Sequence, residues 1–105
     1  MAKYRIAWLP GDGIGIDVLE AAEIVLRRIR LDAAYLPGDI GWEFWRNEGE
    51  ALPLRTVELL KNVDAALFGA ITSKPAQSAA AELSPAVQNR GLAYRSPIVR
   101  MRQLF

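Results

Sequence analysis

The chain has 105 residues, which suits a single domain or part of one. Its 13 Lys and Arg against 12 Asp and Glu leave a net charge of +1, so the overall charge favours neither a nucleic acid nor a membrane surface as a partner. Because the sequence has no Cys and no His, disulfides, zinc–thiolate sites and Ser-His-Asp or Cys-His catalysis within this chain are excluded.

The first third of the chain predicts a strand, a helix and a second strand. Residues 4–9 form a short, mostly apolar run closed by Pro10-Gly11, which is typical of a buried strand. From Ile16 the apolar residues recur at helical spacing, with acidic residues early and basic residues late, as the helix dipole favours. Residues 32–37 predict the second strand. The helix face that we expect to be buried carries Val18, Leu19, Ala22, Val25, Leu26 and Ile29.

The remaining segments predict shorter elements around a third strand. A short helix over residues 41–47 is ended by a glycine, and a second helix opens at Pro53, since proline suits a first helical turn. Residues 65–71 are an apolar run of strand length and predict a third buried strand. A helical turn over residues 79–83 follows. Ser96-Pro97 then has the pattern of an N-cap followed by proline at the first position of a last helix.

Strands that alternate with helices predict an α/β fold, in which a parallel three-stranded sheet layer is flanked by helices. A parallel sheet needs cover on both faces, and the predicted helices hardly suffice. The last helix also stops at the apolar Phe105. We therefore expect residues 1–105 to be the N-terminal segment of the first α/β domain of a larger protein. No segment resembles a signal peptide or the roughly 20 apolar residues of a membrane helix, so we expect a cytoplasmic protein.

The clearest motif is the loop from Gly11 to Gly15 between the first strand and helix. Backbone amides at a helix N-terminus can bind an anion, and glycines allow its close approach. The dinucleotide-binding fingerprint needs a third glycine three positions after the second, where this chain has Ile16. Asp12 would also place a carboxylate beside the phosphates. Spacing alone leaves a structural turn and a nucleotide loop about equally supported.

Other candidate residues each have a plain structural interpretation. Thr72-Ser73 follows the third strand, so with the glycine loop it could border one cleft, although a simple capping role is favoured. Trp42 and Trp45 are more often core anchors than ligand stackers. Arginines pair well with carboxylate or phosphate, but a solvated helix face is the commoner case, and the Ser96 hydroxyl can serve as an N-cap. The arginines concerned are Arg90, Arg95, Arg100 and Arg102, of which Arg95 and Arg102 share a face if the helix begins just before Ser96.

Three segments, in this order, resemble the isocitrate/isopropylmalate dehydrogenase family. They are Ile6 to Gly15, Ala66 to Thr72, and Tyr94 to Gln103. Members of this family are metal-dependent β-decarboxylating dehydrogenases that act on 2-hydroxy acids with NAD or NADP. The resemblance implies a small-molecule 2-hydroxy acid as substrate, a two-domain fold of which this chain is an incomplete part, and a homodimeric full-length enzyme.

The resemblance also implies roles for individual residues. Arg102 matches an arginine that grips a substrate carboxylate, and Ser96 matches a serine that hydrogen-bonds a substrate carboxylate in isocitrate-using members. Ile14, Ile71 and Thr72 match positions at the cofactor site. No catalytic residue and no metal ligand is expected here, because the catalytic Tyr and Lys, further substrate arginines and the aspartates that bind Mg²⁺ or Mn²⁺ lie beyond the matched segments.

Two positions depart from the family pattern. Isocitrate-using members often carry Asn two residues after the serine, where this chain has Ile98. This difference weakens the prediction that isocitrate is the substrate, without replacing it. Lys74 interrupts the usual short run from threonine to proline, which suggests an altered cofactor loop. The favoured function is part of an NAD(P)-dependent oxidative decarboxylase of the isopropylmalate, isocitrate or tartrate type. The alternatives are a stand-alone small-ligand binding module and a non-catalytic truncated product.

Overall fold

Three parallel strands form the centre of the computed structural model, which describes residues 2–72 and 74–105. The strand order is β2-β1-β3, so the first strand lies in the middle. This arrangement confirms the predicted α/β layer with flanking helices. The strands are β1 (Tyr4–Gly11), β2 (Ala33–Pro37) and β3 (Ala65–Ala70), and the helices are α1 (Ile14–Ile29), α2 (Trp42–Glu48), α3 (Leu54–Leu60), α4 (Ala76–Ala81) and α5 (Pro97–Leu104).

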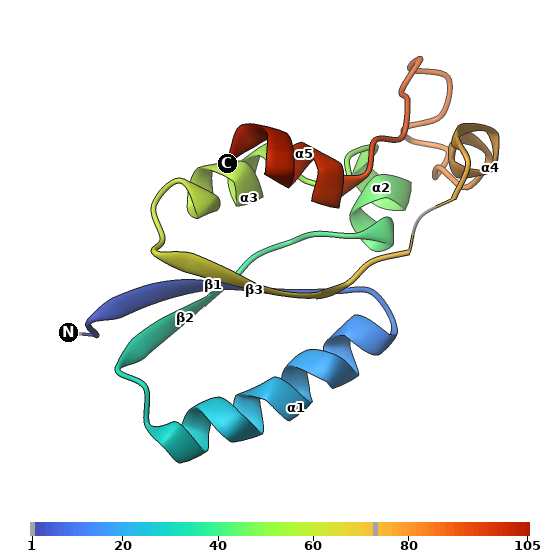
Figure 1. The fold of residues 1–105 in the computed structure, drawn as a ribbon. Coiled ribbons are helices and arrows are strands. Elements are labelled where there is room, and N and C mark those ends of the chain that lie inside the picture. The colour runs from blue at the N-terminus through green and yellow to red at the C-terminus, as the bar shows by residue number, and fades with distance from the viewer. Residues whose placement is uncertain (1, 73) are drawn as a thin grey trace.

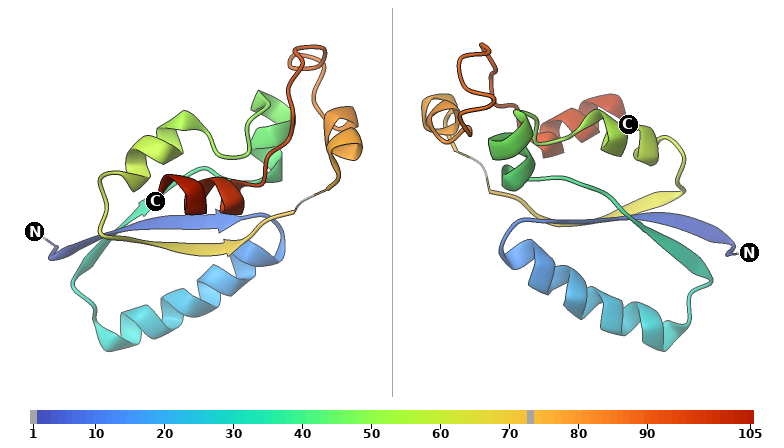
Figure 2. Two further views of the ribbon diagram at one scale, coloured as in Figure 1. Left: turned by 45° about the horizontal axis from the view of Figure 1, so that its top comes forward. Right: turned by 180° about the vertical axis from the view of Figure 1, so that it is seen from behind.

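The helices divide unequally between the two faces of the sheet. Figure 1 shows α1 alone on one face, and α3 and α5 on the other. Short helices α2 and α4 lie towards the carboxyl ends of the strands, where the loops after β1 and β3 also emerge (Figures 1 and 2). Ligand sites in parallel sheets gather at this edge. The unequal cover leaves one face of the sheet with a single helix.

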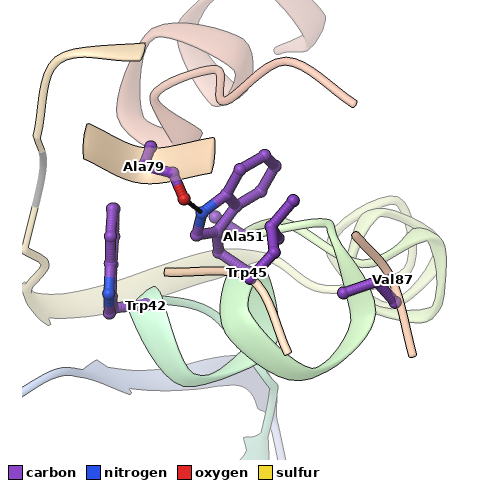
Figure 3. Packing of buried hydrophobic residues seen from close by; sticks show 6 residues of the cluster. Trp42, Trp45, Ala51, Ala79 and Val87 are labelled. Atoms are coloured by element: carbon purple, nitrogen blue, oxygen red, sulfur yellow. Dashed lines mark hydrogen bonds between the residues drawn. The ribbon is translucent and has the colours of Figure 1, made fainter. Parts of the chain in front are cut away.

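Two apolar clusters hold the molecule together. The first joins the sheet to α3, with Met101 of α5 packed against it, and consists of Ala7, Leu9, Ile40, Leu52 and Val57. The second surrounds the two α2 tryptophans beside α4 (Figure 3). Trp42 and Trp45 are 8% and 1% exposed, and the Trp45 indole N–H donates to the Ala79 carbonyl at 2.8 Å. Both tryptophans are therefore core anchors, as the structural interpretation predicted.

The predicted buried face of α1 is only partly correct. Leu19 is buried and Ala22 and Leu26 are half-buried, but Val18, Val25 and Ile29 are exposed. A single helix on a sheet touches it along a narrow strip, so a wide apolar face needs neighbouring elements on both sides. In the described part of the chain, α1 has no such neighbour on its face of the sheet (Figure 1).

Helix boundaries follow the local capping signals. The helix α1 begins at Ile14, two residues before the periodic pattern that predicted it, and α4 begins at Ala76 rather than near residue 79. Pro53 is the residue before α3 rather than its first residue. Ser96 is the N-cap position of α5 and Pro97 its first residue, as predicted. Gly49 ends α2 with a φ of 77°, a left-handed conformation that glycine adopts without strain.

Candidate functional site

The glycine loop is shaped by the packing of its own backbone on β3. A Cβ atom on Gly11 would collide with the Ala70 carbonyl, and one on Gly15 would lie 2.5 Å from the Ala70 amide nitrogen. A Cβ atom on Gly13, by contrast, would meet nothing within 4 Å, although the φ of 47° at this position favours glycine. Gly11 and Gly15 are thus required because the tight strand-to-helix turn packs directly against the β3 backbone and leaves no room for a side chain. This supports the structural interpretation of the loop over a dinucleotide fingerprint.

Asp12 connects three loops at the carboxyl edge of the sheet. Its two carboxylate oxygens accept the Trp42 backbone N–H at 2.9 and 2.8 Å, and one of them also accepts the Thr72 N–H at 3.0 Å. Gly41 has a φ of 124°, and any Cβ there would collide with this carboxylate. The sequence alone indicates Asp12 only as a charge that would oppose phosphates. One feature of the sequence could have indicated that Asp12 bonds neighbouring loops. It is a short acidic side chain directly after a buried strand, at the edge where the loops of a parallel sheet meet.

Thr72 is fixed by its backbone and exposes its side chain. Its N–H is held by Asp12, and its carbonyl accepts the Tyr94 hydroxyl at 3.3 Å. The structure thereby brings the glycine loop and Thr72 together through the Asp12 carboxylate. Ser73, the other half of the predicted pair, lies outside the described residues.

Tyr94 anchors the segment that leads into α5. Its ring makes edge contacts with Trp42 and Trp45, with ring centroids 5.2 and 5.3 Å apart. Two residues later, Ser96 accepts the Arg100 N–H through its backbone carbonyl at 3.1 Å. The Ser96 hydroxyl makes no capping bond to α5. This half-buried side chain therefore keeps its hydroxyl available for a ligand.

The four arginines singled out from the sequence differ in their surroundings. Arg100 is engaged in the fold, since its guanidinium pairs with Glu50 and only 20% of the side chain is exposed. Arg102 lies in the last turn of α5, exposed and without an ion pair among the described residues. Arg95 precedes α5, which begins at Pro97, so the helical face that it was to share with Arg102 does not form. Arg90 is exposed beside a turn.

The two isoleucines expected at the cofactor site lie in different environments. Ile14 stands in the first turn of α1, directly after the glycine loop, and is 69% exposed. Ile71 instead packs against the apolar cluster between the sheet and α3. Ile14 is thus largely exposed, whereas Ile71 is partly buried.

Lys74 is held by α4. Its ammonium lies 2.6 Å from the Glu82 carboxylate and 5.4 Å from the centre of the Trp42 ring. The hydrogen bond from Lys74 lowers the pKa of Glu82 below its ordinary value, and a second bond, from the Trp42 indole at 3.3 Å, acts in the same direction. The lysine that departs from the family pattern therefore fastens the loop after β3 to α4.

Comparison with known proteins identifies the family. The family model described as isocitrate/isopropylmalate dehydrogenase matches residues 5–95. The chain belongs to the isocitrate/isopropylmalate dehydrogenase family. The resemblance stated from the sequence is thus confirmed. The match ends at Arg95, so Ser96 and Arg102 lie just beyond it.

Individual relatives match nearly all of the chain but little of their own length. Protein DlpA of Legionella pneumophila is 48% identical over 94% of this chain and 16% of that protein. The homoisocitrate dehydrogenase of Methanocaldococcus jannaschii is 35% identical over 96% of the chain and 25% of the enzyme. A crystal structure of a beta-decarboxylating dehydrogenase from Thermococcus kodakarensis superposes with a TM-score of 0.63 at 31% identity, covering 96% of this chain and 26% of that one. The chain thus spans about a quarter or less of these relatives.

The donor groups needed for a divalent cation are not gathered in this segment of the dehydrogenase family. Over residues 2–72 and 74–105, no three acidic side chains come together as Mg²⁺ or Mn²⁺ ligands. The described residues therefore do not form a metal site by themselves. In the same described residues, no helix has the length and apolar character to cross a membrane.

Proposed function

We propose that this chain is the N-terminal segment, residues 1–105, of the first α/β domain of an NAD(P)-dependent oxidative decarboxylase. Its substrate is a 2-hydroxy acid of the isopropylmalate, isocitrate or tartrate type, and the complete enzyme is a cytoplasmic homodimer that uses Mg²⁺ or Mn²⁺. The segment supplies contacts to the substrate carboxylate and to the cofactor. Family membership supports the reaction class, because named relatives include isopropylmalate and homoisocitrate dehydrogenases.

One observation carries the proposal: the Asp12 carboxylate holds Thr72 in place while Tyr94 bonds to the same residue, two positions before Ser96. This arrangement fixes the start of α5 beside the loops after β1 and β3. It leaves a free hydroxyl at Ser96 and a free guanidinium at Arg102 on the same short helix segment. A rigid helix suits such groups, because they must be held in place before the ligand arrives.

Each residue then has a definite task. Arg102 binds one substrate carboxylate through the planar fork of its guanidinium, and Ser96 donates a hydrogen bond to a substrate carboxylate oxygen. A bound nicotinamide supplies the hydride-accepting chemistry. The exposed Thr72 and Ile14 contact it from the two loops joined by Asp12, while Ile71 supports Thr72 from the core.

The test is an NMR titration of the ¹⁵N-labelled chain with 3-isopropylmalate, isocitrate and tartrate, and separately with NAD and NADP. We expect a carboxylate ligand to shift amide signals of Ser96 and of the last turn of α5, and a cofactor to shift those of Ile14 and Thr72. Succinate, which lacks the hydroxyl group, serves as the control for unspecific anion binding. Equal responses to succinate and to all three hydroxy acids would contradict the proposed substrate contacts.

A stand-alone small-ligand binding module is the second candidate. It is favoured by the lack of a metal-ligand cluster in the described residues, because binding alone needs neither metal nor acid–base pair. The same titration separates the two functions. Tight binding of one ligand by the isolated chain, with no dependence on further protein, favours the module; weak contacts at the expected residues favour the dehydrogenase segment.

A further inference from the structure

Four residues from four separate segments form a closed circuit of contacts. Thr72, after β3, donates its N–H to the Asp12 carboxylate, which also accepts the Trp42 N–H at the start of α2. The carbonyl of the same Thr72 accepts the Tyr94 hydroxyl, and the Tyr94 ring packs edge-on against the Trp42 ring, so the circuit closes. The two polar groups of the Thr72 backbone are therefore both held by members of this circuit.

The Tyr94 ring is the rigid member of the circuit. It lies against two indoles, with ring centroids 5.2 Å apart for Trp42 and 5.3 Å apart for Trp45. Both tryptophans are buried, and the Trp45 indole N–H is itself bonded to the Ala79 carbonyl (Figure 3). A tyrosine side chain has two torsions, and packing against such neighbours restricts both. The hydroxyl therefore has a set position, which the Thr72 carbonyl shares.

A short, stiff stretch of chain leads from Tyr94 to Ser96. Two residues reach at most roughly 7 Å. A residue before proline is restricted to extended conformations, and Ser96, which precedes Pro97, has a φ of −58° and a ψ of 123°. Pro97 is buried and opens α5, and the Ser96 carbonyl accepts the Arg100 N–H. A displacement of Tyr94 is therefore passed on to the start of α5 instead of being absorbed by a flexible loop.

The hydrogen bond between Tyr94 and Thr72 is poorly suited to a purely stabilising role. It is 3.3 Å long, joins two uncharged groups and lies at an exposed position. A bond of this kind replaces bonds to water with little net gain in stability. Its main effect is geometric, because it sets the distance between the Thr72 carbonyl and the segment that carries Ser96.

We propose that Tyr94 is a positioning residue that couples the loop after β3 to the start of α5, so that a ligand at one raises the affinity for a ligand at the other. This role rests on the proposed function, in which Thr72 contacts the nicotinamide cofactor and Ser96 the 2-hydroxy acid. Each ligand restricts the residue that it contacts and, through the Tyr94 hydroxyl, the other residue as well. The second ligand then binds a segment that is already ordered, which lowers the loss of conformational entropy.

Paired NMR titrations of the ¹⁵N-labelled chain measure this coupling. Isocitrate, 3-isopropylmalate and tartrate are each titrated alone and with saturating NADH or NADPH, which cannot accept a hydride, so no turnover disturbs the equilibrium. We expect the reduced nicotinamide to lower the dissociation constant of the bound acid at least about fivefold. Linkage requires the acid to tighten the nicotinamide by the same factor.

Tyr94→Phe removes the hydroxyl and keeps the ring against the two indoles. We expect the coupling factor to fall below about twofold in this variant, whereas a merely structural role would weaken both ligands and leave the factor unchanged. Tyr35→Phe is the matched control. The Tyr35 ring also meets an indole edge-on, that of Trp8 at 5.5 Å, and its hydroxyl bonds no residue that the structure describes. We expect this control to retain the full coupling.

Hydrogen exchange tests the link without any ligand. In Tyr94→Phe we expect the Thr72 and Arg100 amides to exchange faster by a similar factor, because one hydroxyl restrains both segments. The amides of β1 report on global unfolding and should keep their exchange rates. Faster exchange of the Thr72 amide alone would show that the two segments move independently, which would overturn the proposal.

The titrations separate two kinds of failure. If none of these ligands shifts the Thr72 or Ser96 signals of the natural chain, the proposed function is contradicted, and the coupling with it. If both ligands bind but with independent dissociation constants, or if Tyr94→Phe keeps the coupling of the natural chain, the proposed function stands and the role of Tyr94 is overturned.

Discussion

Arginine side chains on the same helix have different tasks in this protein. The ion pair with Glu50 makes Arg100 part of the packing of α5 against the segment before α3. Arg102, one half-turn further on, keeps an unpaired guanidinium within the described structure. Only the second is suited to capture a ligand from solution, because a guanidinium already paired would first have to give up its partner.

Arg102→Lys is expected to weaken binding of a 2-hydroxy dicarboxylate by about tenfold, since lysine keeps the charge but loses the bidentate fork. Arg95→Lys is the control, because Arg95 lies outside α5 and is exposed. Isothermal titration or NMR measures both dissociation constants. If the two variants bind equally well, Arg102 is an ordinary solvated arginine and its proposed role is wrong.

Asp12→Ala is expected to destabilise the fold by about 1–3 kcal/mol, because it leaves the Trp42 and Thr72 amides without their acceptor. Urea unfolding followed by tryptophan fluorescence measures the loss. Asp32→Ala is the matched control: its side chain bonds no described residue, and the bond from Tyr4 to its backbone carbonyl stays. A loss of the same size in both variants would show that the Asp12 carboxylate has no special part in joining the loops.

At the scale of elements, the sequence predicted the strands and the order of the helices well. Short apolar runs bounded by Pro-Gly or Asp are strong local signals, and β1, β2 and β3 follow them closely. The buried face of α1 was wrong at Val18, Val25 and Ile29 because periodicity reports which side of a helix is apolar, but not which neighbours are present to cover it.

The candidate site, like the fold, could be predicted only in part from the sequence. The sequence located the loops after β1 and β3 and the start of α5, since each carries a turn or capping signal. It did not indicate that Asp12 would bond two amides 30 and 60 residues away, because such contacts depend on how distant segments meet. Nor did it separate Arg100 from Arg102, whose difference rests on Glu50 in another element.

The link between Lys74 and α4 is expected to weaken in acid. A carboxyl whose pKa is lowered in the folded state stabilises that state above its unfolded pKa and loses this contribution as the pH falls through the folded pKa. The pKa of Glu82 is lowered, chiefly by the Lys74 hydrogen bond. We therefore expect the Trp42 indole N–H signal in NMR spectra to shift as the pH falls below the ordinary glutamate range. Glu82→Gln should abolish this titration; an unchanged titration would assign it to another carboxyl.

At the scale of the whole molecule, the proposed function assigns binding groups to this segment and the catalytic groups to the rest of the enzyme. We expect the purified 105-residue chain to show no dehydrogenase activity with isocitrate, 3-isopropylmalate or tartrate, in the presence of Mg²⁺ or Mn²⁺ and of NAD or NADP. The physical reason is that no metal-ligand cluster occurs in the described residues and that the chain has no His as an alternative base. Reduced cofactor is measured by its absorbance, with a complete relative as the positive control. Robust turnover by this chain would contradict the proposed division of tasks.

The Asp12 contacts also have a consequence for the order in which the chain folds. Their partners lie 30 and 60 positions along the sequence, so two large loops must close before the carboxylate is fully satisfied. The first strand and helix can form early from local contacts, but the Thr72 amide gains its acceptor only after β3 has docked beside β1. We therefore expect the Thr72 amide to become protected from hydrogen exchange only after β3 has docked beside β1, and to lose this protection when β3 detaches.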